Sequence, residues 1–133
     1  MDDLLELAER EGVHVNWRDL GRRRGEYRAG ARLITLNPRM STTLQRSTLA
    51  HELGHHHHAD RWTDDPREHA TQERRANLHA ARLLIDPAQY AAAEQLVGPH
   101  AGAIARELGV ALYVVDAFRA TLLHHIPTAR RSA

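Results

Sequence analysis

Two histidines with a glutamate between them are the residues of this sequence best suited to chemistry. They are His51 and His55, and Glu52 follows the first of them. On a helix, a spacing of four residues places both imidazoles on one face, one turn apart, where they can reach a single metal ion. Glu52 is rotated by about 100° from His51. The spacing therefore predicts a metal site on a helix, with a carboxylate standing beside the ion.

A catalytic zinc site usually has three protein ligands and one position left for water. A third histidine on the same helix would require the pattern HExxHxxGxxH, but His58 and Arg61 stand at its last two defined positions. His58 faces the side of the other two histidines, yet it lies a further turn along. Glu73 is the better candidate, because Asn77 one turn later can orient a ligand histidine while Glu73 binds the metal. His58 stays the alternative third ligand.

Composition limits the classes of protein and of site. The chain has 133 residues, 42% of them hydrophobic, enough for one domain with a core. It has no cysteine, so a metal site must use His, Asp, Glu or water. A run of four histidines, His55 to His58, is by itself typical of adventitious metal affinity.

Charge and hydropathy argue against two kinds of partner. The formal net charge is only +1, which gives no overall field toward nucleic acid or an anionic membrane. No apolar run approaches the roughly 20 residues that span a bilayer. The acidic start, residues 1–3, is unlike a signal peptide. We therefore expect a cytoplasmic protein that does not associate with membranes.

Periodicity predicts an α+β fold, with a small antiparallel or mixed sheet at the N-terminus packed on a helical domain. Thr42 and Gln45 have the spacing of a capping box at the start of the metal-binding helix. We expect a single domain over residues 1–126 that ends in a helical hairpin at about 99–124, followed by a polar tail, 127–133. The expected helices are 2–11, 42–58, 65–85, 88–96, 99–108 and 112–123, and the expected strands are 13–17, 26–28 and 31–36.

Two stretches carry a resemblance to a known family. Residues 48–55 (TLAHELGH) and 73–87 (ERRANLHAARLLIDP) resemble the ImmA/IrrE family of metallopeptidases, which carries HELGH and then E-x-x-A-N-x-F-A-A-x-L-L-M-P. The family also tends to have a strand ending in Leu-Asn shortly before the metal helix, as residues 34–37 do here. The resemblance covers about residues 10–120 and implies a zincin-like fold. It assigns the metal ligands His51, His55 and Glu73 and the catalytic residue Glu52.

The sequence departs from the family pattern at two places. His79 stands where the family usually has Phe, and residues 85–87 replace Met-Pro with one residue more. Neither departure touches a ligand that the resemblance assigns. We expect His79 to be a satisfied, buried histidine, with a polar role near the site as the alternative.

The resemblance implies a zinc-dependent endopeptidase that cleaves a DNA-bound transcriptional repressor, often that of a phage or mobile element. One Zn²⁺ per chain is expected, with Mn or Fe less favoured by the same ligands. Glu52 would take a proton from water and pass it to the leaving amine. Strand 31–36 could present an edge to an extended substrate, with an ordinary structural strand as the equal alternative. The side chains able to stabilise the developing oxyanion are His58, His79, Tyr27, Tyr113 and His124.

Two other functions compete with proteolysis. A zinc-binding regulatory protein without activity would use the same residues, but it would not need Glu52. Residues 104–115 also have the look of a DNA-binding helix-turn-helix. The second helix, which would start at Ala111, lacks the Arg, Asn or Gln that read base edges, so direct nucleic-acid binding is disfavoured.

Overall fold

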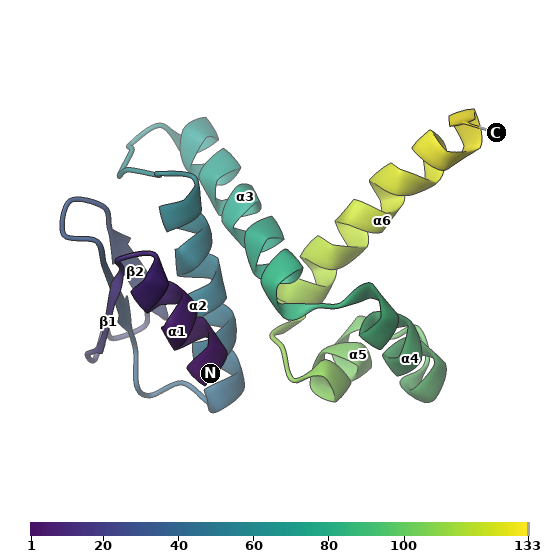
Figure 1. Cartoon of the computed structure of the whole chain (residues 1–133), viewed down its shortest axis with the longest axis horizontal. Coiled ribbons are helices and arrows are strands. Elements are labelled where there is room, and N and C mark those ends of the chain that lie inside the picture. Colours follow the sequence, from purple (N-terminus) through teal and green to yellow (C-terminus); the bar gives the residue numbers. More distant parts are fainter. Residues whose placement is uncertain (133) are drawn as a thin grey trace.

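The fold combines one small sheet with six helices (Figure 1), as the α+β prediction requires. A computed structural model describes the backbone of residues 1–132 and the side chains of residues 1–123. In this part of the chain the elements follow in the order α1 (Asp2–Arg10), β1 (His14–Trp17), β2 (Gly25–Arg28), β3 (Leu33–Leu36), α2 (Thr42–His57), α3 (Pro66–Leu84), α4 (Pro87–Val97), α5 (Ala101–Leu108) and α6 (Leu112–Ser132).

The sheet is mixed, and its central strand is β3. The strand order is β1-β3-β2, with β1 parallel and β2 antiparallel to β3. Ile34 and Leu36 of β3 are fully buried, because β3 packs on α2. The prediction that strand 31–36 offers a free edge to a substrate is wrong, since β3 is hydrogen-bonded on both sides. The edge strand that contacts α2 is β2, and its free edge is the one that faces away from β3.

The first turn of α2 is capped differently from the prediction. Ser41, not Thr42, is the N-cap, because its extended backbone lets Oγ accept a hydrogen bond from Leu44 N at 3.2 Å. Gln45 makes no capping box. Its Nε2 donates to the Met40 carbonyl at 3.0 Å, and its Oε1 accepts from the Trp17 indole at 2.9 Å. Gln45 therefore ties the start of α2 to strand β1.

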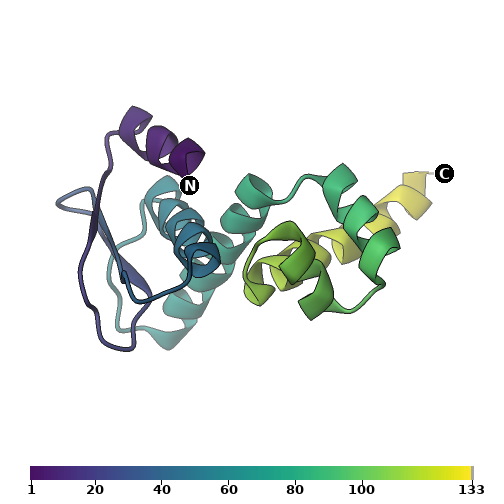
Figure 2. The ribbon, with the colours of Figure 1, turned by 90° about the horizontal axis from the view of Figure 1, so that it is seen from below.

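The C-terminal helices share one core with the sheet. Figure 2 shows α4, α5 and α6 on one side of the molecule and the sheet with α1 and α2 on the other. One continuous apolar cluster runs from Leu4 and Ile34 to Val114 and Phe118. Ala111, just before α6, donates its amide to Ser47 Oγ of α2 at 2.9 Å. These contacts hold the start of α6 against the centre of α2.

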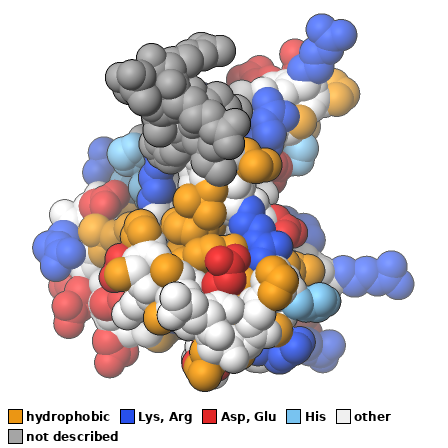
Figure 3. All heavy atoms as spheres, turned by 90° about the vertical axis from the view of Figure 1, so that its right-hand side faces the viewer, with side chains coloured by type: hydrophobic (Ala, Val, Ile, Leu, Met, Phe, Trp, Pro, Cys, Tyr) orange, Lys and Arg blue, Asp and Glu red, His pale blue; other side chains and the backbone are white. Residues whose placement is uncertain are grey.

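The expected C-terminal hairpin is present as α5 and α6, which turn at the left-handed Gly109. The backbone of α6 continues to Ser132, beyond the expected end of its helix at 123. The side chains of the predicted polar tail, 127–133, lie outside the described residues. On the face of the C-terminal helices, apolar side chains lie among charged ones (Figure 3), and the exposed leucines among the described residues of this region are Leu96, Leu112, Leu122 and Leu123. Among the described helices, none combines the length and apolar character needed to cross a bilayer.

Helices α2 and α3 approach each other closely at Gly54. A Cβ added to Gly54 would lie 2.8 Å from Ala76 Cα, 3.0 Å from Ala76 O and 3.0 Å from His79 Cβ. Ala76 is fully buried at the same point. Two small residues therefore let the helix backbones touch, and this contact sets how far the side chains of α3 are from those of α2.

We expect Gly54→Ala to destabilise the protein, although alanine favours a helix by about 1 kcal/mol over glycine. The added methyl meets backbone atoms, and such overpacking costs about 1–3 kcal/mol or more. A net loss of about 1–2 kcal/mol in the free energy of unfolding should appear in urea denaturation. Gly30→Ala is the matched control, because nothing lies within 4 Å of a Cβ added there. Equal stability of the two variants would contradict the close crossing.

Candidate metal centre

The structure brings His51 and His55 of α2 together with Glu73 of α3. The two Nε2 atoms are 3.2 Å apart. Glu73 Oε2 lies 2.9 Å from His51 Nε2, and Glu73 Oε1 lies 3.6 Å from His55 Nε2. These three residues are a group whose ligand atoms could hold one metal ion.

The donor set and its spacing fit a tetrahedral zinc ion. Zinc bonds to imidazole nitrogen and carboxylate oxygen are about 2.0–2.2 Å long, so two ligand atoms at a tetrahedral angle are about 3.3–3.6 Å apart. The observed separations of 3.2 and 3.6 Å are close to this range, and the separation of 2.9 Å needs only a small outward shift of Glu73. Three protein ligands leave the fourth position for water or substrate, which is the pattern of a catalytic rather than a structural site.

Both histidines are oriented through their other ring nitrogen. His51 Nδ1 donates to Asn77 Oδ1 at 2.8 Å, and His55 Nδ1 donates to Asp60 Oδ2 at 2.9 Å. Asp60 is buried, and its second oxygen accepts from Arg75 Nη2 at 3.0 Å. These hydrogen bonds hold both Nε2 atoms toward Glu73 and make the imidazoles better ligands for a metal.

Sequence reasoning found Asn77 but missed Asp60. Asp60 reaches back to His55 because α2 ends in a Schellman turn, in which Asp60 N donates to His55 O and Ala59 N donates to His56 O. Ala59 takes the left-handed conformation, with φ of 54°, at the position where glycine is usual. The absence of that glycine removed the local signal that could have revealed the turn. His69, also missed, lies on the outer side of the site, with Nε2 3.8 Å from Glu73 Oε1.

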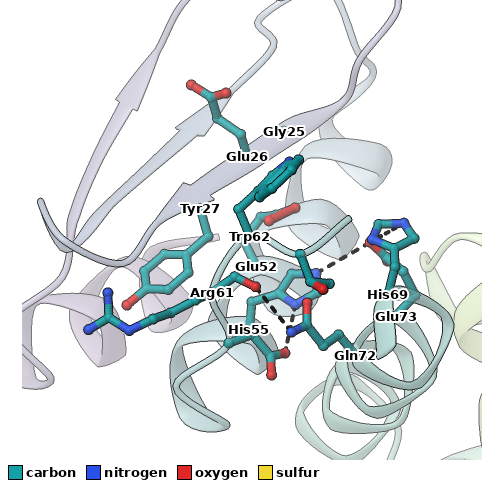
Figure 4. Close-up of a pocket in the computed structure, with 12 residues that line it drawn as sticks. Gly25, Glu26, Tyr27, Glu52, His55, Arg61, Trp62, His69, Gln72 and Glu73 are labelled. Atoms are coloured by element: carbon teal, nitrogen blue, oxygen red, sulfur yellow. Dashed lines mark hydrogen bonds and ion pairs between the residues drawn. The ribbon is translucent and has the colours of Figure 1, made fainter. Parts of the chain in front are cut away.

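Glu52 is buried at the base of an open cavity of about 370 Å³ (Figure 4). Gly25 of β2 lies directly over it, because a Cβ added to Gly25 would be 3.5 Å from Glu52 Cγ and 2.7 Å from Thr48 Cγ2. The same cavity is lined by His55 and Glu73. A buried carboxylate thus stands beside the three candidate ligands and opens toward solvent with them.

Comparison with protein families assigns most of this chain to one family. The model of peptidase family M78, described as the IrrE N-terminal-like domain, matches residues 8–119. The chain belongs to this family. A search of curated proteins finds no significant match. Membership identifies a metallopeptidase family and agrees with a His, His, Glu metal site.

Burial and proximity set the charges of this IrrE-like site. Burial raises the pKa of Glu52, although the two candidate ligand histidines oppose the shift. Hydrogen bonds from His51 and His55 lower the pKa of Glu73. Burial alone would lower the pKa of His55, but its bonds to Glu73 and Asp60 outweigh that effect and raise the pKa to about 9. Without metal, a proton on His55 supplies the positive charge that the carboxylates attract, so metal binding should release that proton.

The side chains that were candidates for stabilising the oxyanion lie in different parts of the IrrE-like fold. Tyr113 of α6 lines a second cavity together with His51, and the two ring centroids are 6.0 Å apart. Tyr27 of β2 lines the first cavity, but its hydroxyl is 3.0 Å from His56 Nδ1. His58 and His79 line neither cavity. The side chain of His124 lies outside the described residues.

We expect Asp60→Asn to weaken metal binding about 10- to 100-fold, the usual effect of removing a group that orients a ligand histidine. An amide keeps the size of the side chain but no longer supplies the negative charge opposite His55. The dissociation constant for Zn²⁺ can be measured by competition with a chromophoric chelator. Asp64→Asn, at an exposed position of the same loop, is the control and should keep the affinity of the unmodified protein. Equal affinities for both variants would show that Asp60 has no part in the site.

Proposed function

We propose that the protein is a zinc-dependent endopeptidase that hydrolyses a peptide bond in a protein substrate, a DNA-binding transcriptional repressor. The observation that carries the proposal is the position of Glu52. Glu52 is only 6% exposed, and it lines two open cavities, one with His55 and Glu73 and the other with His51 and Glu73. A protein that only stored or displayed a metal would gain nothing from burying a further carboxylate there that is not one of the three candidate ligands.

Glu52 has the properties of a general base. Burial disfavours its ionised form, and a raised pKa brings a carboxylate closer to the neutral range in which it can accept and return a proton. A bound Zn²⁺ would supply the Lewis acid that activates water and polarises the carbonyl group of the scissile bond. Glu52 accepts a proton from the attacking water and later donates it to the leaving amine.

The free edge of β2 supports an extended peptide as substrate. Asn37 N donates to Arg24 O at 2.9 Å. Along an antiparallel strand, every second residue directs its backbone amide and carbonyl at the partner strand, and on the β2 side of the pair this series begins at Arg24. The backbone amides and carbonyls of Gly25 and Tyr27 therefore point outward, and both residues line the cavity beside Glu52. An extended chain added to this edge would run past the catalytic carboxylate. The indole of Trp62, 87% exposed, lies at the same cavity (Figure 4) and can contact an apolar substrate side chain.

Tyr113 is the proposed donor to the oxyanion that develops during hydrolysis. It lines the cavity that Glu52, His51 and Glu73 share, whereas His58 and His79 do not. Burial raises the pKa of Tyr113 to about 12, so the phenol keeps its proton at neutral pH and can donate it in a hydrogen bond. The start of α6 thereby completes the site that α2 and α3 form.

The alternative of a helix-turn-helix is disfavoured by the packing of α6. Val114 and Val115 are fully buried, and the amide of Ala111 bonds to Ser47 of α2. The exposed side chains of the first turns of α6 include Leu112 and Asp116, which are not the Arg, Asn or Gln side chains with which a recognition helix reads base edges. The proposal of a repressor substrate rests instead on membership of the IrrE-like family and on the resemblance of residues 48–55 and 73–87 to ImmA/IrrE peptidases.

We expect Glu52→Gln to keep zinc and to lose roughly 10²–10⁴-fold in turnover, because a general base contributes about that factor. The purified protein and the variant are each incubated with zinc and an extract of the source cells, and new N-termini are identified by mass spectrometry. N-termini that need both zinc and Glu52, including one in a DNA-binding protein, would support the proposal. If every N-terminus is also produced by Glu52→Gln, the regulatory protein without activity becomes the better explanation.

We expect Tyr113→Phe to lower kcat about 10²–10³-fold, the usual effect of removing one oxyanion donor, with little change in KM. Kinetics on a peptide that spans the identified cleavage site will measure both constants. Tyr27→Phe is the matched variant, since Tyr27 also lines the cavity but has its hydroxyl at His56. A larger loss of kcat in Tyr27→Phe would transfer the role to that residue.

A further inference from the structure

We propose that Arg24 selects the substrate by pairing with an acidic side chain, Asp or Glu, close to the bond to be cleaved. This inference rests on the proposed endopeptidase function and adds the chemical class of peptide that the site accepts. Arg24 lies directly before β2, the strand whose free edge would hold an extended peptide. It therefore stands at one end of the path along which that peptide would run.

Arg24 shares a cavity with the candidate centre. The second cavity, of about 410 Å³, is lined by Arg24 together with His51, Glu52, Tyr113 and others. Burial raises the pKa of Tyr113, and Arg24 is the first of the charges that oppose this shift, so its guanidinium lies near enough to act on the phenol. A substrate bound between Glu52 and Tyr113 would therefore come within reach of Arg24.

The neighbouring arginines already share a carboxylate, whereas Arg24 does not. Glu26 of β2 forms ion pairs with Arg18 at 3.2 Å, with Arg23 at 3.0 Å and with Arg28 at 3.5 Å. The ion pairs formed among the described residues do not include Arg24. Arg24 therefore brings an uncompensated positive charge to the cavity.

The carboxylates of the same cavity are engaged elsewhere. Glu73 lies 2.9 Å from His51 Nε2 and 3.6 Å from His55 Nε2, and Glu52 is buried on α2. A guanidinium has a planar fork of donors that matches a carboxylate, and the pair becomes stronger where a bound substrate displaces water. A carboxylate supplied by the substrate is the partner that Arg24 lacks.

A buried asparagine holds the backbone that carries Arg24. Asn37 Nδ2 donates to the carbonyls of Gly21 and Arg23, each at 3.0 Å, and Asn37 N donates to the Arg24 carbonyl at 2.9 Å. These three hydrogen bonds fix the end of the loop before any substrate arrives. Binding then has to order only the side chain of Arg24, which lowers its entropic cost.

A peptide suits this arrangement better than a nucleic acid does. Binding of a nucleic acid draws its affinity from several cations placed along the phosphate backbone. Here, Glu26 compensates part of the charge of three neighbouring arginines, and Arg24 lies in a cavity beside Glu52. A guanidinium inside a cavity is placed to read a single side chain rather than a row of phosphates.

The first test selects peptides by binding, so that it does not require hydrolysis. A library of short random peptides, acetylated and amidated so that every carboxylate belongs to a side chain, is passed over zinc-loaded Glu52→Gln. The same selection is made with Glu52→Gln/Arg24→Glu and with Glu52→Gln/Arg22→Glu. Arg22 is the matched control, because it is exposed in the same loop and lines neither cavity. Elemental analysis verifies equal zinc in all three proteins, and mass spectrometry identifies the bound peptides.

We expect Asp and Glu to be enriched in the peptides bound by Glu52→Gln and by the Arg22 control, and Lys and Arg to replace them with Arg24→Glu. No acidic enrichment with Glu52→Gln would overturn the inference. Equal loss of the enrichment in both charge-reversed proteins would also overturn it, because the preference would then belong to the loop as a whole. If a DNA duplex displaces the acidic peptides and needs Arg22 as much as Arg24, the loop is a nucleic-acid surface and the inference fails.

The second test uses the active protein on one selected peptide and on a copy in which the acidic residue is replaced by its amide. We expect kcat/KM to be about 10- to 100-fold higher for the acidic peptide, the usual range for a hydrogen-bonded charge pair, and this ratio to be lost in Arg24→Glu. A ratio that Arg24→Glu retains would overturn the inference. Cleavage of both peptides alike would leave the endopeptidase standing without this selectivity, whereas acidic peptides that bind through Arg24 and are never cleaved would refute the endopeptidase and retain Arg24 as the carboxylate contact.

Discussion

The close contact of α2 with α3 is the constraint on which the rest of the molecule depends. Gly54 and Ala76 carry so little side chain that the two backbones touch, and a Cβ on Gly54 would lie 2.8 Å from Ala76 Cα. Without that approach, Glu73 could not come within 2.9 Å of His51. The glycine inside the HELGH motif is therefore as important to the site as its histidines. It acts through the distance between helices rather than through any contact with a metal.

Around this crossing, the remaining elements supply what the proposed hydrolytic site would need beyond its candidate ligands. Strand β2 covers Glu52 and offers outward-facing amides at its free edge, while the start of α6 brings Tyr113 to the second cavity that Glu52 also lines. Asn77 and Asp60 orient the two candidate ligand histidines from α3 and from the turn after α2. The small sheet and the C-terminal hairpin are thus parts of the same site, although each is far from it in sequence.

Most elements could be predicted from the sequence, because periodicity and turn residues act locally. The α+β composition, the metal helix and the α5–α6 hairpin are seen as expected, with ends that differ by a few residues. The N-cap of α2 is Ser41 and not the predicted Thr42, because neighbouring hydroxyl residues give similar sequence signals and only the backbone conformation selects one of them. The edge strand was misplaced for another reason: alternation of residues within strand 31–36 does not reveal that β1 joins β3 on its second side.

The sequence by itself determined the relation of His51, Glu52 and His55, because helix geometry fixes the angle between residues of one element. It indicated Glu73 only through the spacing to Asn77 and the resemblance to a family. Tertiary structure alone decided that Asp60 returns to His55, that Tyr113 rather than His58 or His79 faces the cavity, and that His79 meets His57. Each of these pairings joins residues of separate elements. The distances between them depend on how the helices cross and how a turn reverses the chain, and local sequence patterns determine neither.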